Sequence, residues 1–458
     1  MKKNKHVLYF DNHYTAPIMV RGEGPYLYDE EGRKYLETCG GSISNSLAYG
    51  REDMAKAIGD QALTLPFAYF AHMDASLRHE AADAMAKAFP AFDRFFFCSG
   101  GSEATEIATK IARLHFYHSG KPEKNKIIGR WMSYHGYTEG ALAYGGHPSR
   151  RKEFAEILRE DGHIPPAYCY RCWYGKSCEN CNMECAYALE EEILKAGPET
   201  VAAFIAEPVV GTALCGVPAP EGYFGIIRDI CDKYDVLLIA DEVMCGTGRT
   251  GTMSCIEQYG VEPDIIALAK SLGGAYFPVG AVGMKEKVAG PIMDNGIFPV
   301  LHTWTASPMA CAVISKTLDI IQSEDLLANV RKVGAYFMEQ LRSLQQRNPY
   351  IGDVRGKGMM IGLEFVKDKE TKEPFPAEMK LGEKLYQKGI DNGLILMECM
   401  GIDHGKQGDA LLFGPCFEFT EDNVDETMEL LEKTIHDVFN EKQMGIYLTA
   451  YVTTIEYE

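Results

Sequence analysis

Two short aliphatic runs near the middle of the chain, each followed by charged residues, stand out in the hydrophobic pattern. VLLIADEV (236–243) and DIIALAK (264–270) are continuous and of strand length, which is typical of strands buried on both faces of a parallel sheet. The first carries Asp241 and Glu242 at its end, and the second ends in Lys270, just before a glycine-rich turn. Because ligands bind at the carboxyl ends of parallel strands, the pattern predicts that a carboxylate and an amine face one site.

Strands and helices alternate on both sides of these runs. Apolar strands are predicted over 95–97, from Lys126 and over 201–207, and amphipathic helices from Glu103 onward and over 222–234. This alternation predicts an α/β protein with a mostly parallel sheet and crossover helices.

The hydrophobic pattern changes after the last strand of the predicted parallel sheet. Long helices and antiparallel strand pairs follow, which predicts a smaller α+β domain that the N-terminal strands join. The expected division is an N-terminal segment at 1–60, a large domain at 61–310 with a cysteine-rich excursion at 164–186, and a C-terminal domain at 311–458.

Asp241 and Lys270 together have one well-known chemical use. Pyridoxal phosphate (PLP) forms a Schiff base with a lysine, and it needs a carboxylate that keeps its pyridine nitrogen protonated. The alternative is that both are salt-bridged residues at strand ends, without a ligand.

Two loops bear on that choice. The segment SGGS (99–102) joins a strand to a helix, where free N–H groups and the helix dipole suit a phosphate, although such turns are also glycine-rich for steric reasons. Tyr134 and His135 lie on a later loop, and an aromatic ring there either stacks on a flat cofactor or packs in the core.

Composition excludes several classes of partner. The formal net charge of −19 argues against nucleic acids and anionic membranes. No stretch approaches the length of a membrane span or a signal peptide, so the expected compartment is the cytoplasm. With 46% hydrophobic and 24% charged residues, the 458-residue chain is expected to be a soluble globular enzyme of two or three domains.

The excursion at 164–186 holds five of the fourteen cysteines. Their C-x2-C pairs have a zinc-type spacing, but the pairs are closer together than in common zinc modules and one thiol is in excess. The alternatives are a structural metal site and a reduced or redox-active surface excursion. No metal is expected in the catalytic chemistry. The residues are Cys169, Cys172, Cys178, Cys181 and Cys185.

The motifs, taken in order, resemble one family. YLYDEEGRKYLE, SGGSEATE, SYHGYT, AEPVVG, LLIADEVMCGTGRTG, DIIALAKSLGG, HTWTASPMACA and VRGKGMMIGLEF run from residue 26 to 365. In this order the chain resembles the class III (subgroup II) aminotransferases, PLP enzymes of fold type I, over residues 20 to 440. The resemblance implies pyridoxal 5′-phosphate as the cofactor.

The resemblance also implies roles for individual residues. Lys270 matches the Schiff-base lysine, which also moves the substrate proton, and Asp241 matches the partner of the pyridinium nitrogen. Gly101 and Ser102 match the phosphate-binding turn. Thr303 matches a threonine that reaches the neighbouring subunit's phosphate, which implies a homodimer, or a dimer of dimers, with shared sites.

Four further residues match positions around the cofactor and substrate. Tyr134 corresponds to the aromatic residue that stacks on one face of the ring, with His135 beside it. Val243 corresponds to the aliphatic residue on the other face, and Glu207 to an acidic residue near the substrate.

Some positions depart from the family pattern. Gly100 replaces a hydroxyl residue of the phosphate turn, and Met244 replaces a glutamine beside the cofactor's 3-oxygen. The C-terminal arginine that usually binds a 2-oxo acid is missing from 397–409, where the cations are Lys406 and His404. Arg249 is therefore the candidate for the carboxylate, unless the substrate is unusual.

The leading hypothesis is a transaminase that moves an amino group from an amine or an ω-amino acid to a 2-oxo acid such as pyruvate or 2-oxoglutarate. An amino-acid racemase, epimerase or aminomutase on the same fold is the alternative, since the motifs do not decide where the Cα proton goes. A PLP-free binding protein on this fold is disfavoured because it would have no need for Lys270 together with Asp241. A metal-dependent hydrolase is disfavoured because the candidate ligands are all thiols and lie outside the mouth of the sheet.

Overall fold

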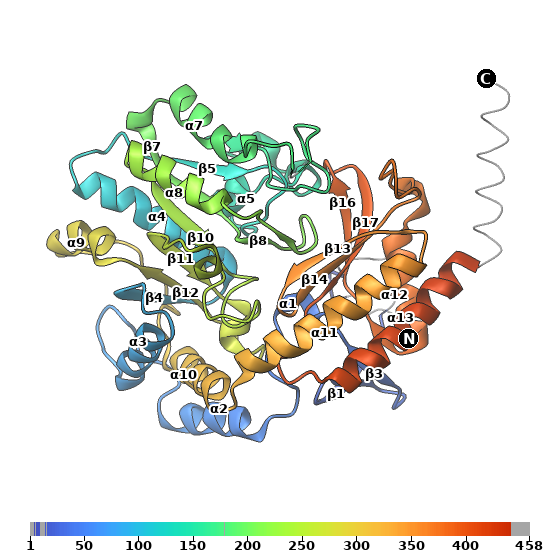
Figure 1. Cartoon of the computed structure of the whole chain (residues 1–458). Coiled ribbons are helices and arrows are strands. Elements are labelled where there is room, and N and C mark those ends of the chain that lie inside the picture. Colours follow the sequence, from blue (N-terminus) through green and yellow to red (C-terminus); the bar gives the residue numbers. More distant parts are fainter. Residues whose placement is uncertain (1–3, 5, 10–13, 15, 178, 441–458) are drawn as a thin grey trace.

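A computed structural model of the chain describes residues 4, 6–9, 14, 16–177 and 179–440 (Figure 1). Its centre is a seven-stranded sheet in the order β4-β12-β11-β10-β7-β5-β6. The strands are β4 (Arg94–Cys98), β12 (Gly280–Met284), β11 (Ile265–Leu268), β10 (Leu237–Asp241), β7 (Val201–Ala206), β5 (Lys126–Arg130) and β6 (His163–Ile164).

The prediction of a mostly parallel sheet is confirmed, with one exception. Strand β12 runs antiparallel to both of its neighbours, β11 and β4, while the other pairings of the sheet are parallel. Every residue of β7, β10, β11 and β12 is buried. This explains why these strands lack an alternation of apolar and polar residues.

Helices cover both faces of the sheet and bury it. On one face, α4 (Gly101–His118), α5 (Glu139–Tyr144) and α9 (Glu286–Asp294) pack with the strands in one hydrophobic cluster. On the other face, a second cluster includes α3 (Ser76–Ala88), α7 (Glu184–Ala196), α8 (Tyr223–Tyr234) and α10 (Pro308–Ser323). The sheet is therefore the middle layer of three, as Figure 1 shows.

A second, antiparallel sheet lies beside the first and has its own hydrophobic cluster. Its order is β13-β14-β17-β16, with strands β13 (Ile351–Lys357), β14 (Met360–Phe365), β17 (Gln407–Phe413) and β16 (Glu398–Asp403). The helices α11 (Leu326–Arg347) and α12 (Leu381–Asn392) pack on this sheet, and α13 (Glu421–Asn440) packs against both helices.

The beginning of the chain reaches the same region. Strands β1 (Met19–Glu23), β2 (Tyr26–Asp29) and β3 (Lys34–Glu37) form a meander, and β3 pairs in parallel with β15 (Leu394–Ile395). The irregular α1 (Gly40–Ile43) and the helix α2 (Glu52–Thr64) then lead to the central sheet. Shorter elements are α6 (Pro148–Arg151), β8 (Val209–Val210) and β9 (Val217–Pro218).

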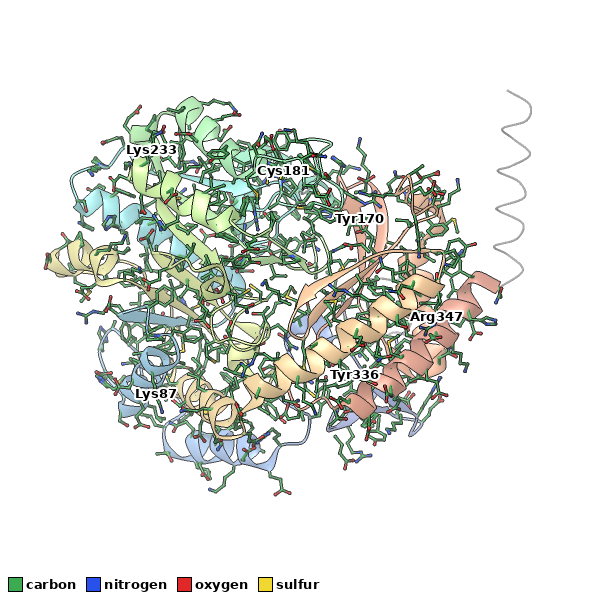
Figure 2. All side chains as sticks on the ribbon, in the orientation of Figure 1. Lys87, Tyr170, Cys181, Lys233, Tyr336 and Arg347 are labelled. Atoms are coloured by element: carbon green, nitrogen blue, oxygen red, sulfur yellow. The ribbon has the colours of Figure 1, made fainter. Side chains whose placement is uncertain are left out.

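The cysteine-rich excursion is attached to the C-terminal sheet by a buried ionic network. Glu364 on β14 accepts hydrogen bonds from Arg171 Nε at 2.6 Å, from Arg355 Nη1 at 2.6 Å and from the Tyr168 hydroxyl. Figure 2 shows Tyr170, from the same excursion, next to the strands of this sheet. The excursion is thus part of the packed structure.

Candidate active site

Asp241 and Lys270 line one cavity at the carboxyl ends of β10 and β11. The two strands are paired in parallel, with Asp241 opposite Ala267, so both side chains emerge at the same edge of the sheet. The cavity has a volume of about 570 Å³. Of the predicted site residues, it is lined by Gly101, Ser102, Tyr134, His135, Glu207, Asp241, Val243 and Lys270.

Neighbouring groups hold the carboxylate of Asp241 in a fixed orientation. Its Oδ2 lies 2.6 Å from His135 Nδ1, and its Oδ1 accepts the backbone N–H of Val243 at 3.0 Å. An ionised carboxylate only accepts, so we assign the hydrogen to Nδ1 of the imidazole. Asp241 is 3% exposed, and two donors therefore hold a buried negative charge at the base of the cavity.

Glu242, the next residue, points away from the cavity. Its carboxylate accepts hydrogen bonds from Ser254 Oγ at 2.8 Å and from the backbone N–H groups of Cys255 at 2.6 Å and Ile256 at 2.8 Å. Burial raises the pKa of Glu242 to about 7, although these hydrogen bonds oppose the shift. The alternation of side chains along a strand thus gives one carboxylate to the site and the other to a turn.

The amine of Lys270 lies against the N-terminal part of the chain. Its Nζ donates to the carbonyl oxygen of Ser42 at 2.5 Å and lies 3.3 Å from the Ser42 hydroxyl. Burial lowers the pKa of Lys270 to about 8, although the charges of Asp241 and Glu207 oppose this. Lys270 has φ +44°, in the left-handed region that side chains rarely adopt, and such strain is common at functional sites.

The lowered pKa predicts how the cofactor-free protein should capture an aldehyde. The neutral amine is the nucleophile, so the capture rate should rise as pH increases through about 8 and level off above it. For an amine with the ordinary pKa of 10.5, the capture rate would still rise steeply up to pH 10. The measurement is the rate at which PLP develops its lysine-bound absorption band between pH 6.5 and 10. A rate that keeps rising tenfold per unit above pH 9 would contradict the assigned environment.

The phosphate turn is the N-terminus of α4. Helix α4 begins at Gly101, and Gly100 before it is fully extended, with φ 175° and ψ 179°. A Cβ on Gly101 would lie 2.7 Å from Val243 Cγ1, so only glycine fits against this valine. The Ser102 hydroxyl accepts the N–H of Tyr137 at 3.1 Å. The first turn of this 18-residue helix therefore presents N–H groups to the cavity.

Glu207 connects the loop of Tyr134 to the loop after β7. Its carboxylate accepts the N–H of Tyr134 at 3.1 Å and that of Gly211 at 2.8 Å. Burial raises the pKa of Glu207, and the nearby His135 imidazole opposes the shift. Glu207 is thus a cavity residue that also orders the backbone under Tyr134.

Thr303 does not line this cavity. It is exposed on the loop before α10, next to the exposed Trp304. One chain alone therefore does not bring Thr303 to the cavity lined by Asp241 and Lys270.

Arg249 is not available for a substrate, and that expectation was wrong. Its side chain is fully buried and donates to the backbone carbonyl groups of Asn45 and Met359, each at 3.3 Å, and of Pro415. Burial lowers its pKa to about 10. Arg249 instead links three backbone segments, because its guanidinium satisfies carbonyl groups that the fold leaves unpaired.

Several cavity residues were not predicted from the sequence. Ser42 and Ser44 come from the glycine- and serine-rich loop after β3, Thr212 follows β8, and Tyr276 and Phe277 follow the lysine turn. The only signal for Ser42 was its glycine-rich context, because 228 residues separate it from Lys270.

The described cysteines of the excursion gather around a second, much smaller cavity. Cys169, Cys172, Cys181 and Cys185 line a space of about 20 Å³, and Figure 2 shows Cys181 in this region. Cys178, the remaining member of the predicted cluster, lies outside the described residues. Among the residues that the structure describes, no three His, Cys, Asp or Glu side chains are arranged to hold a metal ion. The metal hypothesis therefore gains no support from the described part of the cluster.

The sequence profile of the family named Aminotransferase class-III matches residues 9–435. The chain is a class III aminotransferase. It is 34% identical to the diaminobutyrate–2-oxoglutarate transaminase of Halomonas elongata, over 93% of this chain and 92% of the relative. It is 33% identical to the putrescine–pyruvate aminotransferase of Pseudomonas aeruginosa, over 93% and 91% of the two chains.

A solved structure shows the same fold. The omega transaminase of Pseudomonas jessenii, in complex with PMP, superposes with a TM-score of 0.88 at 32% identity, over 94% of this chain and 96% of that one. This class III aminotransferase is accordingly a PLP-dependent transferase of fold type I. Within the described residues, no helix is both long enough and apolar enough to cross a membrane.

The cavity of this aminotransferase fits PLP in each of its parts. The buried Asp241 carboxylate suits a protonated pyridine nitrogen, the N-terminus of α4 suits a phosphate, and Lys270 is an amine that loses its proton readily. The buried Nε2 of His135 has no hydrogen-bond partner within the described structure, which leaves a polar group for a ligand. The cofactor supplies the electron sink of the reaction.

Proposed function

We propose that Lys270 forms the Schiff base with PLP and that Asp241 faces its pyridine nitrogen. The observation that carries this assignment is that both side chains line one cavity, next to the N-terminus of α4. Gly101 and Ser102 hold the phosphate with their backbone N–H groups. His135 orients Asp241 through the 2.6 Å contact.

The remaining site residues hold the ring and the proton. Tyr134 covers one face of the cofactor ring and Val243 the other, and both line the cavity. Lys270, once displaced from the cofactor, carries the proton that leaves the substrate Cα, a role that its pKa of about 8 favours near neutral pH. Glu207 takes part on the substrate side, where it is buried and faces the same cavity.

The enzyme transfers an amino group from an amine or an ω-amino acid to a 2-oxo acid such as pyruvate or 2-oxoglutarate. Support for this substrate class comes from the relatives, whose names specify a diamine or diamino acid as donor and pyruvate or 2-oxoglutarate as acceptor. Their donors share a primary amine at the end of an alkyl chain.

A half-reaction screen tests this function. The PLP-loaded protein is mixed with single amines, such as putrescine, diaminobutyrate and benzylamine, and the visible band of the lysine-bound cofactor is followed. We expect loss of the band with at least one donor and its return on addition of pyruvate or 2-oxoglutarate. A protein whose band survives every donor, while it racemises an amino acid, would contradict the proposal.

The working unit that we propose is a homodimer, or a dimer of such dimers, in the cytoplasm. Thr303 of each subunit reaches the phosphate in its partner's site, which accounts for its exposed position away from its own cavity. Sedimentation of the PLP-loaded protein should give at least the mass of two chains of 50.9 kDa. A fully active monomer would reject shared sites.

We also propose that the chain divides into an N-terminal segment (1–60), a large domain (61–310) and a C-terminal domain (311–458). The separate hydrophobic clusters of the two sheets support such a division.

A further inference from the structure

We propose that Arg150 binds the carboxylate of the 2-oxo acid acceptor. The inference deepens the proposed function and rests on it, because it names the residue that recognises that substrate. A 2-oxo acid carries a full negative charge next to its reacting carbon. The cavity already holds the carboxylates of Asp241 and Glu207, so it needs a cation besides Lys270, which reacts with the cofactor.

Arg150 is placed beside the cavity by two contacts with lining residues. Its Cζ lies 4.6 Å from the centroid of the Tyr134 ring, and its Nη2 donates to Thr212 Oγ1 at 2.8 Å. Tyr134 and Thr212 both line the cavity. Its charge also helps to lower the pKa of Lys270, after the larger effect of burial. The guanidinium therefore lies within electrostatic reach of the reacting amine.

The guanidinium of Arg150 is not committed to a protein carboxylate. A guanidinium has five N–H donors, and the hydrogen bond to Thr212 uses one of them. Among the residues that the structure describes, no Asp or Glu forms a salt bridge with it. Arg249, the other arginine whose charge lowers the pKa of Lys270, is enclosed by backbone carbonyl groups.

The position of α6 explains why Arg150 is suited to this role. Helix α6 begins against the turn between β16 and β17, where a Cβ on Gly405 would lie 2.6 Å from Pro148 Cδ. That turn offers no arginine: its Lys406 is exposed, and its His404 ring stacks on Trp173 with 4.8 Å between centroids and contacts Asp403 at 2.9 Å. Arg150 therefore supplies an arginine from α6, next to the C-terminal turn that itself has none.

The contact with Tyr134 also favours arginine over lysine at this position. A planar guanidinium stacked on an aromatic ring keeps its orientation and offers two parallel N–H groups to a carboxylate. A lysine would retain the positive charge but could not donate two parallel hydrogen bonds to a carboxylate.

Single-turnover kinetics of the PMP-loaded protein test this role. In Arg150→Met, the pyruvate concentration that gives half the maximal rate should rise at least about tenfold, with the rate at saturation within about threefold of wild type. For Arg150→Lys, the pyruvate concentration at half the maximal rate should lie between the values for wild type and Arg150→Met. Arg342→Met, which removes an exposed positive charge from α11, is the matched control and should behave as wild type.

The other half-reaction serves as an internal reference. Reaction of the PLP-loaded Arg150→Met protein with an amine that has no carboxylate should stay within about threefold of wild type. An unchanged pyruvate dependence, or equal losses with pyruvate and with the amine, would overturn the assignment.

A binding measurement keeps the test independent of turnover. Calorimetric titration of the PLP-loaded protein uses oxamate and glutarate, carboxylates that cannot accept the amino group. We expect binding to wild type and to Arg342→Met, and at least about tenfold weaker binding to Arg150→Met. No binding to wild type, or equal binding to Arg150→Met, would overturn the inference. Carboxylate binding without any half-reaction would instead count against the proposed function alone.

Discussion

The Lys270→Ala protein is expected to lose at least about four orders of magnitude in turnover, because one amine is both the covalent anchor and the proton carrier. It should remain folded, since among the described residues the Lys270 amine hydrogen-bonds only with Ser42 and takes part in no ion pair. Added PLP should stay as the free aldehyde form, without the lysine-bound band. The measurements are the half-reaction rate and the visible spectrum after gel filtration.

Two controls make the Lys270 result specific. Lys87→Ala removes an exposed lysine from α3, labelled in Figure 2, and should leave rate and spectrum unchanged. Methylamine added to Lys270→Ala should restore part of the rate, since it replaces the missing base. A variant that still developed the lysine-bound band would show that another lysine forms the Schiff base.

The second large effect is expected for Asp241→Asn, at about a thousandfold loss of turnover or more. The neutral amide cannot hold a proton on the pyridine nitrogen, so the cofactor becomes a weaker electron sink. Packing should survive, because the amide has nearly the same shape and His135 can change tautomer to accept from the new NH₂. The lysine-bound band should therefore still form, with a shifted maximum, while single-turnover rates fall.

The neighbouring carboxylate provides the matched comparison. Glu242→Gln changes a buried carboxylate that points to the 254–256 turn, so it should lower the melting temperature and leave the rate within about tenfold of wild type. If Asp241→Asn turned over at a normal rate, the electron-sink role of Asp241 would be untenable. A loss of activity in Glu242→Gln as large as in Asp241→Asn would show that the two carboxylates are not distinguished.

Local patterns in the sequence predicted the centre of the site because that centre is built from contiguous runs. The aliphatic run before Asp241 has no alternation, which indicates burial on both faces, and the observed β10 is buried throughout. The glycine-rich start of α4 could be predicted for the same reason, because it too is a contiguous run of residues. Lys270 and Asp241 line one cavity because parallel strands end at one edge, a rule that needs no long-range information.

What the sequence did not predict depends on contacts between distant segments. The direction of β12 is not encoded in GAVGM, which is as apolar as a parallel strand. Ser42 contacts Lys270 only because the N-terminal segment folds back over the sheet. Arg249 looked available because its neighbours in sequence are small and polar, whereas its partners Met359 and Pro415 are more than a hundred residues away.

The network around Glu364 bears on how far this chain can be shortened. Two of the described donors to that buried carboxylate, Tyr168 and Arg171, belong to the excursion, and the third, Arg355, comes from the adjacent strand. A loop graft that trims 164–186 would remove two of these three donors and leave the buried carboxylate with unsatisfied acceptor positions inside the antiparallel sheet. Any compact redesign of this scaffold would thus have to supply new donors to Glu364, or repack Glu364 together with Arg355, in the same step.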